Sequence, residues 1–335
     1  MNNVIYDYLT FTSKIDGPES VIDLLGFDSD IFEFLEGKGR YFYKDCMRYD
    51  NCINIYYGGL NEGVCVEMSG KGCRAFETLG NGDYNKIFEY ILDNYDDDSE
   101  KRQANITRLD VAYDDLSGIL DLYGYFVPEV QKENFVSRCN RAGVHWDNLD
   151  GSTVYHGSER QSNVYIRMYD KLREQVKVRK NEVDESVKHW VRCELQLKKE
   201  CALGFIKLKG DIRKNYFDTI NNYLRYVVPS DNETNKSMLP SSPEWLQFIE
   251  TWETASVFAK PGMSYNISKL DYFVTNQLSG AISTFVDLVG VDKFVQYIDE
   301  GRKQHRTLNP KYKELYKQHE KAADSIEAYL KERGL

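Results

Sequence analysis

Long apolar segments and closely spaced metal-ligating residues are both missing from this sequence. No apolar run approaches the ~18 residues that a transmembrane helix needs, and residues 1–12 lack the basic start and apolar core of a secretory signal. The seven cysteines contain no CxxC pair, and the five histidines contain no HxH pair. These absences argue against a disulfide framework and a zinc site. We therefore expect free thiols, a cytoplasmic location and no membrane partner.

Positive charge is also scarce, and it is unevenly distributed. The chain has 43 Lys and Arg against 53 Asp and Glu, a formal net charge of −10. Residues 1–100 contain 8 basic against 20 acidic residues, whereas residues 151–215 contain 15 against 9. This separation indicates a face that meets a polyanion, although chance unevenness on a solvated surface would look the same.

The pattern of apolar residues predicts a globular protein with many strands. The 335 residues, 41% hydrophobic and 29% charged, are enough for two or three domains. Period-two alternation dominates up to about residue 200. The predicted strands are 4–12, 40–48, 51–58, 63–69, 106–115, 134–146, 152–157, 163–171 and 189–198. One or two short helices are predicted over 18–36, with a break at Gly26, and further helices at 71–79, 83–95, 118–131 and 200–209.

The order of these elements repeats as strand, helix, strand meander, helix. We therefore predict an α+β fold with two antiparallel sheets from an internal duplication and helices on one face of each. From residue 212 the pattern becomes helical, with later helices at 267–300 and 309–333. The predicted domains are 1–100, 101–228 with the catalytic motifs, a linker at 229–243 and a helical region at 244–335.

The polar sides of four predicted strands have an unusual composition. Alternate residues of a strand lie on opposite faces, so each strand has an apolar and a polar side. The polar sides are Glu67 in VCVEMSG, Arg108, Asp110 and Asp114 in ITRLDVAYDD, Tyr165, Arg167, Tyr169 and Lys171 in NVYIRMYDK, and Arg192, Glu194 and Gln196 in WVRCELQLK. A sheet covered on one face has a polar outer side anyway, but that alone does not predict arginine, carboxylate and tyrosine at alternate positions.

Such a face suits the chemistry of phosphodiesters. Asp110 and Glu194 offer hard oxygen ligands for one divalent cation, which would polarise a phosphate. Arginines would bind phosphate oxygens, and a tyrosine would attack as a phenolate whose pKa is lowered by the metal and by Lys171. Each residue also has a structural alternative, since Asp110 can pair with Arg108 or Arg192 and most tyrosines pack in cores.

These motifs resemble the Rep_trans family, which comprises rolling-circle replication initiators of Gram-positive plasmids and phages and related relaxases of integrative conjugative elements. The resemblance lies in ITRLDVAYDD, TVYHGSERQSNVYIRMYDKLREQ and WVRCELQL, with VEMSGKGCR before them and EWLQFIE after the linker. It covers roughly residues 4–300, with several motifs in the right order. It implies a fold similar to a pair of TBP-like sheets and a metal bound without a histidine pair.

The resemblance also implies which tyrosine reacts. The family motif R-x-Y-[ND]-K-x-x-E reads RMYDKLRE here. It places the nucleophile on Tyr169, with Arg167, Lys171 and Glu174 around it. Tyr165 remains a competing nucleophile, because it lies on the same face of the same strand.

The family's acidic positions carry over to Asp110 in TRLD and Glu194 in RCEL, and the implied cofactor is Mg²⁺ or Mn²⁺. The residues expected to contact DNA are Arg108, Arg160 and Arg192. The implied reaction is metal-dependent, site-specific DNA nicking and strand transfer through a 5′-phosphotyrosine. It would initiate rolling-circle replication or conjugative transfer.

The implied partner is DNA, in the form of an origin hairpin that is single-stranded at the nick site. A homodimer and a host helicase are further expected partners, because a nickase does not unwind DNA. Two alternatives remain open. A non-catalytic protein would bind a specific DNA sequence on a two-sheet saddle, and a metal-dependent nuclease would use water in place of a tyrosine.

Overall fold

The computed structural model describes residues 3–148, 151–181, 183–208, 210–233, 235–254 and 279–305. The chain forms two compact units, Met1–Lys260 and Pro261–Leu335. In the second unit, helices α10 (Ser279–Val289) and α11 (Val291–His305) are separated by Gly290. The φ of Gly290 is +87°, a conformation that glycine adopts easily and that ends a helix. The predicted helix at 267–300 is therefore broken there, and the one at 309–333 lies outside the described residues.

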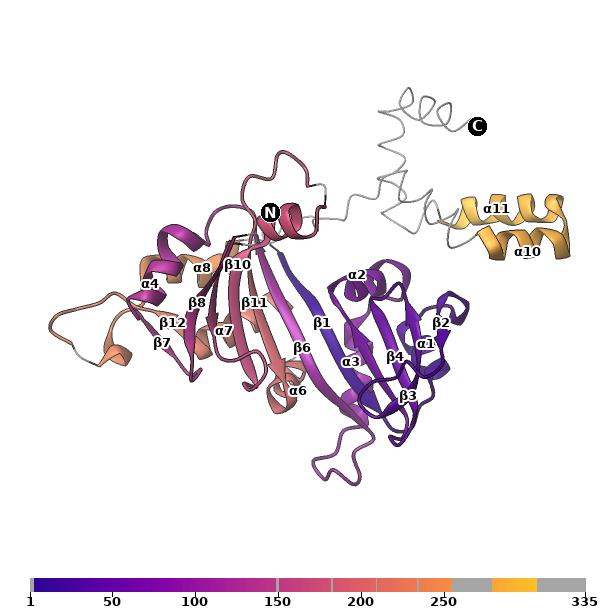
Figure 1. Ribbon diagram of the computed structural model, residues 1–335, viewed down its shortest axis with the longest axis horizontal. Helices are drawn as coiled ribbons and strands as arrows, with labels where there is room; N and C mark the ends of the chain where they lie inside the picture. Colours follow the sequence, from indigo (N-terminus) through magenta and orange to yellow (C-terminus); the bar gives the residue numbers. More distant parts are fainter. Residues whose placement is uncertain are drawn as a thin grey trace. The chain divides into compact units, whose positions relative to one another are not determined.

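The first unit is built on an antiparallel ten-stranded sheet with the order β2-β3-β4-β5-β1-β6-β11-β10-β9-β8 (Figure 1). A separate two-stranded sheet pairs β7 (Phe135–Ser137) with β12 (Leu224–Tyr226). The strands of the large sheet are β1 (Asn3–Ser13), β2 (Glu33–Leu35), β3 (Tyr43–Tyr49), β4 (Ile53–Gly59), β5 (Val64–Met68), β6 (Ala104–Asp115), β8 (Ala142–Asp147), β9 (Gly151–His156), β10 (Val164–Asp170) and β11 (Val191–Lys198).

The large sheet consists of two halves with the same strand order. We call β1–β5 the first half and β6 with β8–β11 the second half. The α+β class is confirmed, and the two expected sheets are joined edge to edge through β1 and β6. These are strands of 11 and 12 residues, and each would otherwise expose a row of unpaired backbone groups. Their pairing satisfies both edges at once.

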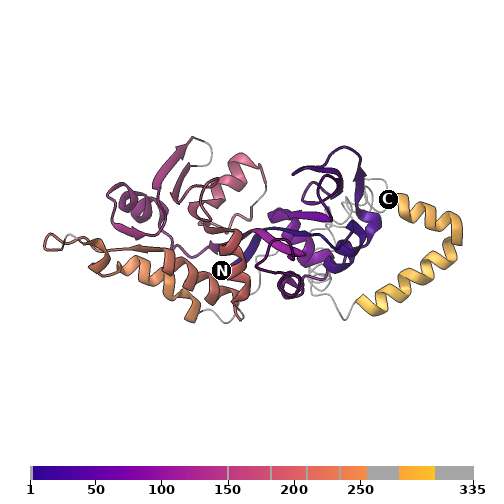
Figure 2. The same ribbon diagram turned by 90° about the horizontal axis from the view of Figure 1, so that it is seen from below.

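The principal helices pack on the apolar face of the sheet. Leu9 of β1, Leu109 of β6 and Leu195 of β11 are fully buried in one core with side chains from these helices. Figure 2 shows the pink and orange helices α7 and α8 along one side of the second half. The helices of this unit are α1 (Pro18–Leu25), α2 (Gly70–Leu79), α3 (Tyr84–Asp93), α4 (Val127–Gln131), α5 (Lys171–Arg173), α6 (Lys199–Lys207), α7 (Ile212–Tyr223) and α8 (Pro243–Thr254).

Several local elements differ from the expected ones. Helix α1 ends at the break expected at Gly26, which adopts a left-handed φ of +72°, but residues 33–35 form β2 and not a second short helix. The expected strand at 134–146 is divided into β7 and β8, which belong to different sheets. A helical turn that the sequence pattern did not predict follows β10, as α5 and a π-helical turn at Glu174–Val178.

The segment at 229–243 lies within the first unit. Val227 forms a β-bridge with Ser241, which closes this segment into a long loop. Helix α8, which follows it, buries Trp245 and Phe248 in the core of the sheet. None of the described helices combines the length and apolar character needed to cross a lipid bilayer.

Candidate active site

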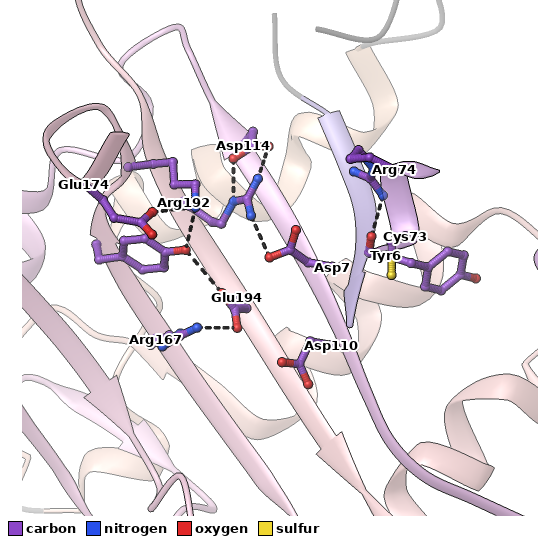
Figure 3. A network of polar contacts seen from close by, with 12 residues as sticks. Tyr6, Asp7, Cys73, Arg74, Asp110, Asp114, Arg167, Glu174, Arg192 and Glu194 are labelled. Carbon is purple, nitrogen blue, oxygen red and sulfur yellow. Dashed lines mark hydrogen bonds and ion pairs between the residues drawn. The ribbon is translucent and has the colours of Figure 1, made fainter. Parts of the chain in front are cut away.

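Three neighbouring strands of the second half bring the predicted site residues together on the polar face of the sheet. The register of β10 and β11 places Arg167 beside Glu194, and that of β11 and β6 places Gln196 beside Asp110. Since cross-strand neighbours point to the same face, Glu194 and Asp110 lie diagonally on adjacent strands. Figure 3 shows Arg167, Glu194 and Asp110 following one another across these strands.

The hydroxyl group of Tyr169 lies among one carboxylate and two cations. It donates a hydrogen bond to Glu194 Oε2 at 3.3 Å, while Arg167 donates to Glu194 Oε1 at 2.7 Å. The Arg167 guanidinium also lies 5.2 Å from the centre of the Tyr169 ring. Lys171 Nζ is 3.5 Å from the Tyr169 oxygen and 2.5 Å from a carboxylate oxygen of Glu174.

The turn after β10 positions the lysine. Asp170 caps this turn by accepting a hydrogen bond from the backbone N–H of Arg173 at 2.8 Å. The chain then continues into the π-helical turn, a form that is often found at functional sites. Residues three apart in a helical turn are neighbours, so Lys171 and Glu174 meet and the lysine is held beside Tyr169.

Burial and charge set the protonation states of the central pair. Burial raises the pKa of Tyr169 well above its ordinary value, and the negative charge of Glu194 raises it further. Burial also raises the pKa of Glu194, but the positive charges of Arg167 and Arg192 outweigh it and hold that pKa below its ordinary value. At neutral pH the free protein therefore holds a protonated tyrosine beside an ionised glutamate.

Asp110 is buried on β6 and held by one arginine. Arg108 donates from Nε to Oδ1 at 2.8 Å and from Nη2 to Oδ2 at 2.5 Å. Burial raises the pKa of Asp110 to about 7, since the negative charge of Glu194 adds to the effect and Arg108 only partly opposes it. The two carboxylates are thus close enough to repel each other, and a cation between them would offset that repulsion.

The donor set of Asp110 and Glu194 fits a hard divalent cation, because such ions prefer oxygen ligands. Among the described residues, no group of three or more His, Cys, Asp or Glu side chains is placed to hold a metal ion. Mg²⁺ is commonly held by one or two carboxylates together with substrate phosphates and water, so two are sufficient.

Arg192 is buried beneath the site and bound on three sides by acceptors. Its Nε and Nη2 atoms donate to the two oxygens of Asp114, each at 2.7 Å, and Nη1 donates to Asp7 Oδ2 at 2.7 Å (Figure 3). Trp190 Nε1 donates to Asp114 as well, at 2.7 Å. Burial raises the pKa of Asp114, but Arg192 outweighs it and the pKa lies below its ordinary value. Arg192, predicted to contact DNA, therefore presents no free guanidinium here and instead joins β1, β6 and β11.

The other predicted residues lie around this centre. Arg108, besides binding Asp110, stacks on the ring of Tyr8 at 4.2 Å from its centre. Arg160 is exposed in the turn between β9 and β10. Tyr165 is half-buried on the same face of β10 as Tyr169, but its hydroxyl makes no hydrogen bond to Asp110 or to Glu194.

Sequence reasoning missed two residues of the network. Asp7 reaches Arg192 because the pairing of β1 with β6 is irregular between Tyr6 and Tyr8, and no sequence signal marks such a bulge. Trp190 was detectable, because it precedes Arg192 by two residues and alternation places both on one face.

Comparisons with known proteins place this arrangement in a family. The model of the Rep_trans family, described as replication initiation factor, matches residues 104–301. The model of the rolling circle replication initiation protein N-terminal domain matches residues 3–92. Together the two matches span both halves of the sheet.

Two individual proteins are also similar. A protein of Bacillus subtilis (strain 168) that bears the name DNA relaxase NicK is 28% identical over 266 residues, which are 76% of this chain and 73% of that protein. The solved structure of a rolling circle replication initiator protein from Geobacillus stearothermophilus superimposes with a TM-score of 0.61 at 25% identity. The superposition covers 74% of this chain and 96% of that one. The chain therefore belongs to the Rep_trans family of replication initiation factors.

Proposed function

We propose that this protein nicks one DNA strand at a specific site and transfers it through a 5′-phosphotyrosine on Tyr169. The reaction would initiate rolling-circle replication or conjugative transfer. The observation that carries this proposal is the hydrogen bond from Tyr169 to Glu194, one strand away from Asp110 on the polar face. A tyrosine, two carboxylates on adjacent strands and an arginine bound to one of them are the groups that such a transfer requires.

In the proposed reaction the Tyr169 oxygen forms a bond to the scissile phosphorus, and the bond from phosphorus to the 3′ oxygen breaks. The phenolic proton passes to water, because Glu194, which accepts the Tyr169 hydrogen bond at 3.3 Å, is held ionised by Arg167 and Arg192, and the 3′ oxygen takes a proton from water. Arg167 and Lys171 stabilise the negative charge that develops on the phenolate and the phosphate. The phosphodiester is exchanged and not hydrolysed, so a 3′-hydroxyl can later reverse the attack and rejoin the strand.

Asp110 and Glu194 would hold Mg²⁺ or Mn²⁺, which when bound supplies positive charge that polarises the phosphate. Arg108 and Arg167 each bind one of these carboxylates by charge-assisted hydrogen bonds. Such partners orient the ligand oxygens. The carboxylate side chains therefore lose less conformational freedom when a metal binds.

The DNA would be single-stranded at the nick site, within an origin hairpin, and its backbone would cross the polar face near Arg160. We extend the proposal to a homodimer acting in the cytoplasm with a host helicase, because the nicking reaction itself does not separate the strands.

The test is incubation with Mn²⁺ and a labelled single-stranded oligonucleotide that contains the nick site of the host element. A denaturing gel then detects a covalent adduct, and peptide mapping identifies the modified residue. The Tyr165→Phe variant is the matched control, because it removes a hydroxyl from the same face of the same strand. We expect the wild type and Tyr165→Phe to form an adduct at Tyr169.

The other outcomes separate the alternatives. An adduct on Tyr165 would keep the reaction and overturn the assignment of the nucleophile. Cleavage without any adduct would indicate a nuclease that uses water. Binding without cleavage, unchanged in a Tyr169→Phe variant, would indicate a non-catalytic DNA-binding protein.

A further inference from the structure

A cavity of about 410 Å³ opens where the start of β6 and the end of β11 meet helix α6, away from Tyr169. Figure 1 shows α6 beside these strand ends. We call this cavity of about 410 Å³ the basic cavity. The lining residues used below are Tyr95, Arg102, Thr107, Lys198, Lys199 and Glu200. Three of these side chains are cationic and one is a carboxylate, in a chain whose net charge is −10.

The cations of the basic cavity are held in place without carboxylate partners. Arg102 donates to the backbone oxygens of Asp96 and Asp97, at 2.8 Å and 3.2 Å, and its guanidinium lies 4.4 Å from the centre of the Tyr95 ring. Lys198 Nζ donates to the backbone oxygen of Glu159. In the part of the chain that the structure describes, neither of these cations nor Lys199 forms an ion pair within 4.0 Å.

A second cavity in the same unit shows that this charge is not a general property of its hollows. That cavity, of about 550 Å³, lies beside α5 and we call it the neutral cavity. It is lined by three cations and three carboxylates: Arg173, Lys177 and Lys188 with Asp170, Asp184 and Glu185. The neutral cavity supplies its own counter-charges. The basic cavity has one carboxylate, Glu200, for three cations, and an anion from outside would balance the remaining positive charge.

The charged form of Lys198 is disfavoured mainly by burial. Burial lowers its pKa, and the positive charge of Arg108 lowers it further, although Asp110 and Glu159 partly oppose them. A bound anion would act in the opposite direction. The acidic loop at 96–100 does not supply this negative charge. Its backbone oxygens accept hydrogen bonds from Arg102, and none of its side chains lines the cavity.

The basic cavity lies at the ends of two strands, β6 and β11, that also carry residues of the proposed nick site. Lys198 is the cross-strand neighbour of Arg108, the residue that binds Asp110. Lys198 also follows Glu194 by four residues on β11, so the two lie on the same face about 13 Å apart along the strand. A nucleic acid strand bound at Tyr169 and extended along β11 would reach the cavity.

We propose that the basic cavity binds a backbone phosphate of the same DNA strand, a few nucleotides from the phosphate that Tyr169 attacks. This rests on the proposed nicking function. Arg102 and Lys199 would contact the phosphate oxygens directly, and the Thr107 hydroxyl would add a neutral donor. The cavity would thereby fix which phosphate of the strand reaches Tyr169.

The test compares Lys199→Gln and Arg102→Gln with Lys86→Gln, an exposed lysine of α3 on the helix layer. Affinity for a labelled single-stranded oligonucleotide is measured by anisotropy across a salt series. Loss of one phosphate contact should reduce the slope of log affinity against log salt by about 0.7 in either cavity variant. Lys86→Gln should keep the wild-type slope, and thermal melting checks that each variant is folded.

Shortening the oligonucleotide one nucleotide at a time from each end locates the phosphate. The wild type should lose affinity in one step, roughly 3- to 10-fold, when that phosphate is removed, and Lys199→Gln should show no such step. Wild-type slopes in both cavity variants would overturn the proposal. So would competition by inorganic pyrophosphate without any step in the length series, which would indicate a small-anion site. If the wild type forms no covalent adduct at all, it is the proposed nicking function that fails.

Discussion

The two halves of the sheet share a strand order but differ in the residues that they place on the polar face. In the second half, Glu194 of β11 is bound by Arg167 at 2.7 Å and receives the Tyr169 hydroxyl. In the first half, β5 takes the corresponding place and carries Glu67, which accepts the Tyr41 hydroxyl at 2.9 Å. Each half thus pairs a glutamate with a tyrosine, but the arginines differ: Arg167 is hydrogen-bonded to Glu194 at 2.7 Å, whereas the exposed Arg40 lies 4.0 Å from Glu67.

The rest of each polar face follows the same division. The second half places Lys171 and the buried Arg192 around its tyrosine, so several cations surround one reactive oxygen. The first half instead buries an apolar cluster of Tyr43, Cys46, Tyr56 and Cys65 on that face. Tyr41 lies in the turn before β3, whereas Tyr169 lies on β10, whose counterpart in the first half is β4. The comparison teaches that a duplicated scaffold repeats the strand order without repeating the tyrosine position or the charge, and that the charge determines which half can stabilise a phosphate.

The largest expected effect concerns the two tyrosines. Tyr169→Phe should abolish the covalent adduct and slow nicking by roughly 10⁴-fold or more, because it removes the nucleophile. Tyr41→Phe removes the hydroxyl that binds Glu67 in the first half and should still form the adduct. Gel quantification of adduct against time measures both. Loss of the adduct in Tyr41→Phe would mean that the first half takes part in the chemistry.

The next effect concerns the two glutamates. Glu194→Gln should weaken binding of Mn²⁺ by at least about 10²-fold, since even residues that only orient a metal ligand contribute 10- to 100-fold. Glu67→Gln should leave that affinity within about 3-fold of the wild type, because Glu67 is not paired with a second carboxylate whose repulsion a cation would relieve. Calorimetric titration with Mn²⁺ compares them, and equal losses would place a metal in each half.

A smaller effect is expected from two arginines of the sheet. Arg192→Met should lower the free energy of unfolding by about 3–5 kcal/mol, because Asp114 and Asp7 lose a buried counter-charge. Arg48→Met should cost only about 1–2 kcal/mol, since Arg48 is half-buried and its partners, Asn54 and Asn51, are neutral. Urea denaturation measures both. If Arg48→Met lowered the free energy of unfolding as much as Arg192→Met, the two halves would not differ in the stability that their arginines provide.

The smallest effect is a dependence of stability on pH that belongs to the second half alone. Burial lowers the pKa of His156 to about 3, and its Nε2 is 3.0 Å from the Tyr226 hydroxyl. The neutral imidazole is favoured in the folded state, so its contribution is present above pH ~6.5 and is lost as the pH falls toward 3. Between pH 7 and 5 this loss should be about 2 kcal/mol.

The His156→Gln variant measures this contribution, because glutamine keeps a donor for Tyr226 but does not titrate. Urea denaturation at pH 7 and pH 5 should show a smaller loss of stability in the variant than in the wild type. Residues 1–103 contain no histidine, so protection factors from hydrogen exchange should fall first near β9 at pH 5 and stay high in β3–β5. An equal fall in both halves would assign the effect to other groups.

Alternation of apolar and polar residues was sufficient to predict much of the fold and the common face of the candidate site. It placed Asp110, Tyr169 and Glu194 on one side of their strands because a period of two depends only on local sequence. It did not predict that β1 and β6 pair, because strand pairing depends on which edges remain free after each half folds. The burial of Arg192 was equally hidden, since it depends on a bulge that turns Asp7 inward.

The pairing of β1 with β6 also affects how the chain folds during synthesis. Ser13 pairs with Ala104 and Asn3 with Asp114, so β1 leaves the ribosome roughly 5–20 s before its partner at ordinary rates of translation. During this interval a nascent first half exposes an unpaired eleven-residue edge, the kind of surface on which chains aggregate. Ribosome stalling before residue 115 would prolong that exposure, so the nascent chain is most vulnerable just before the two halves join.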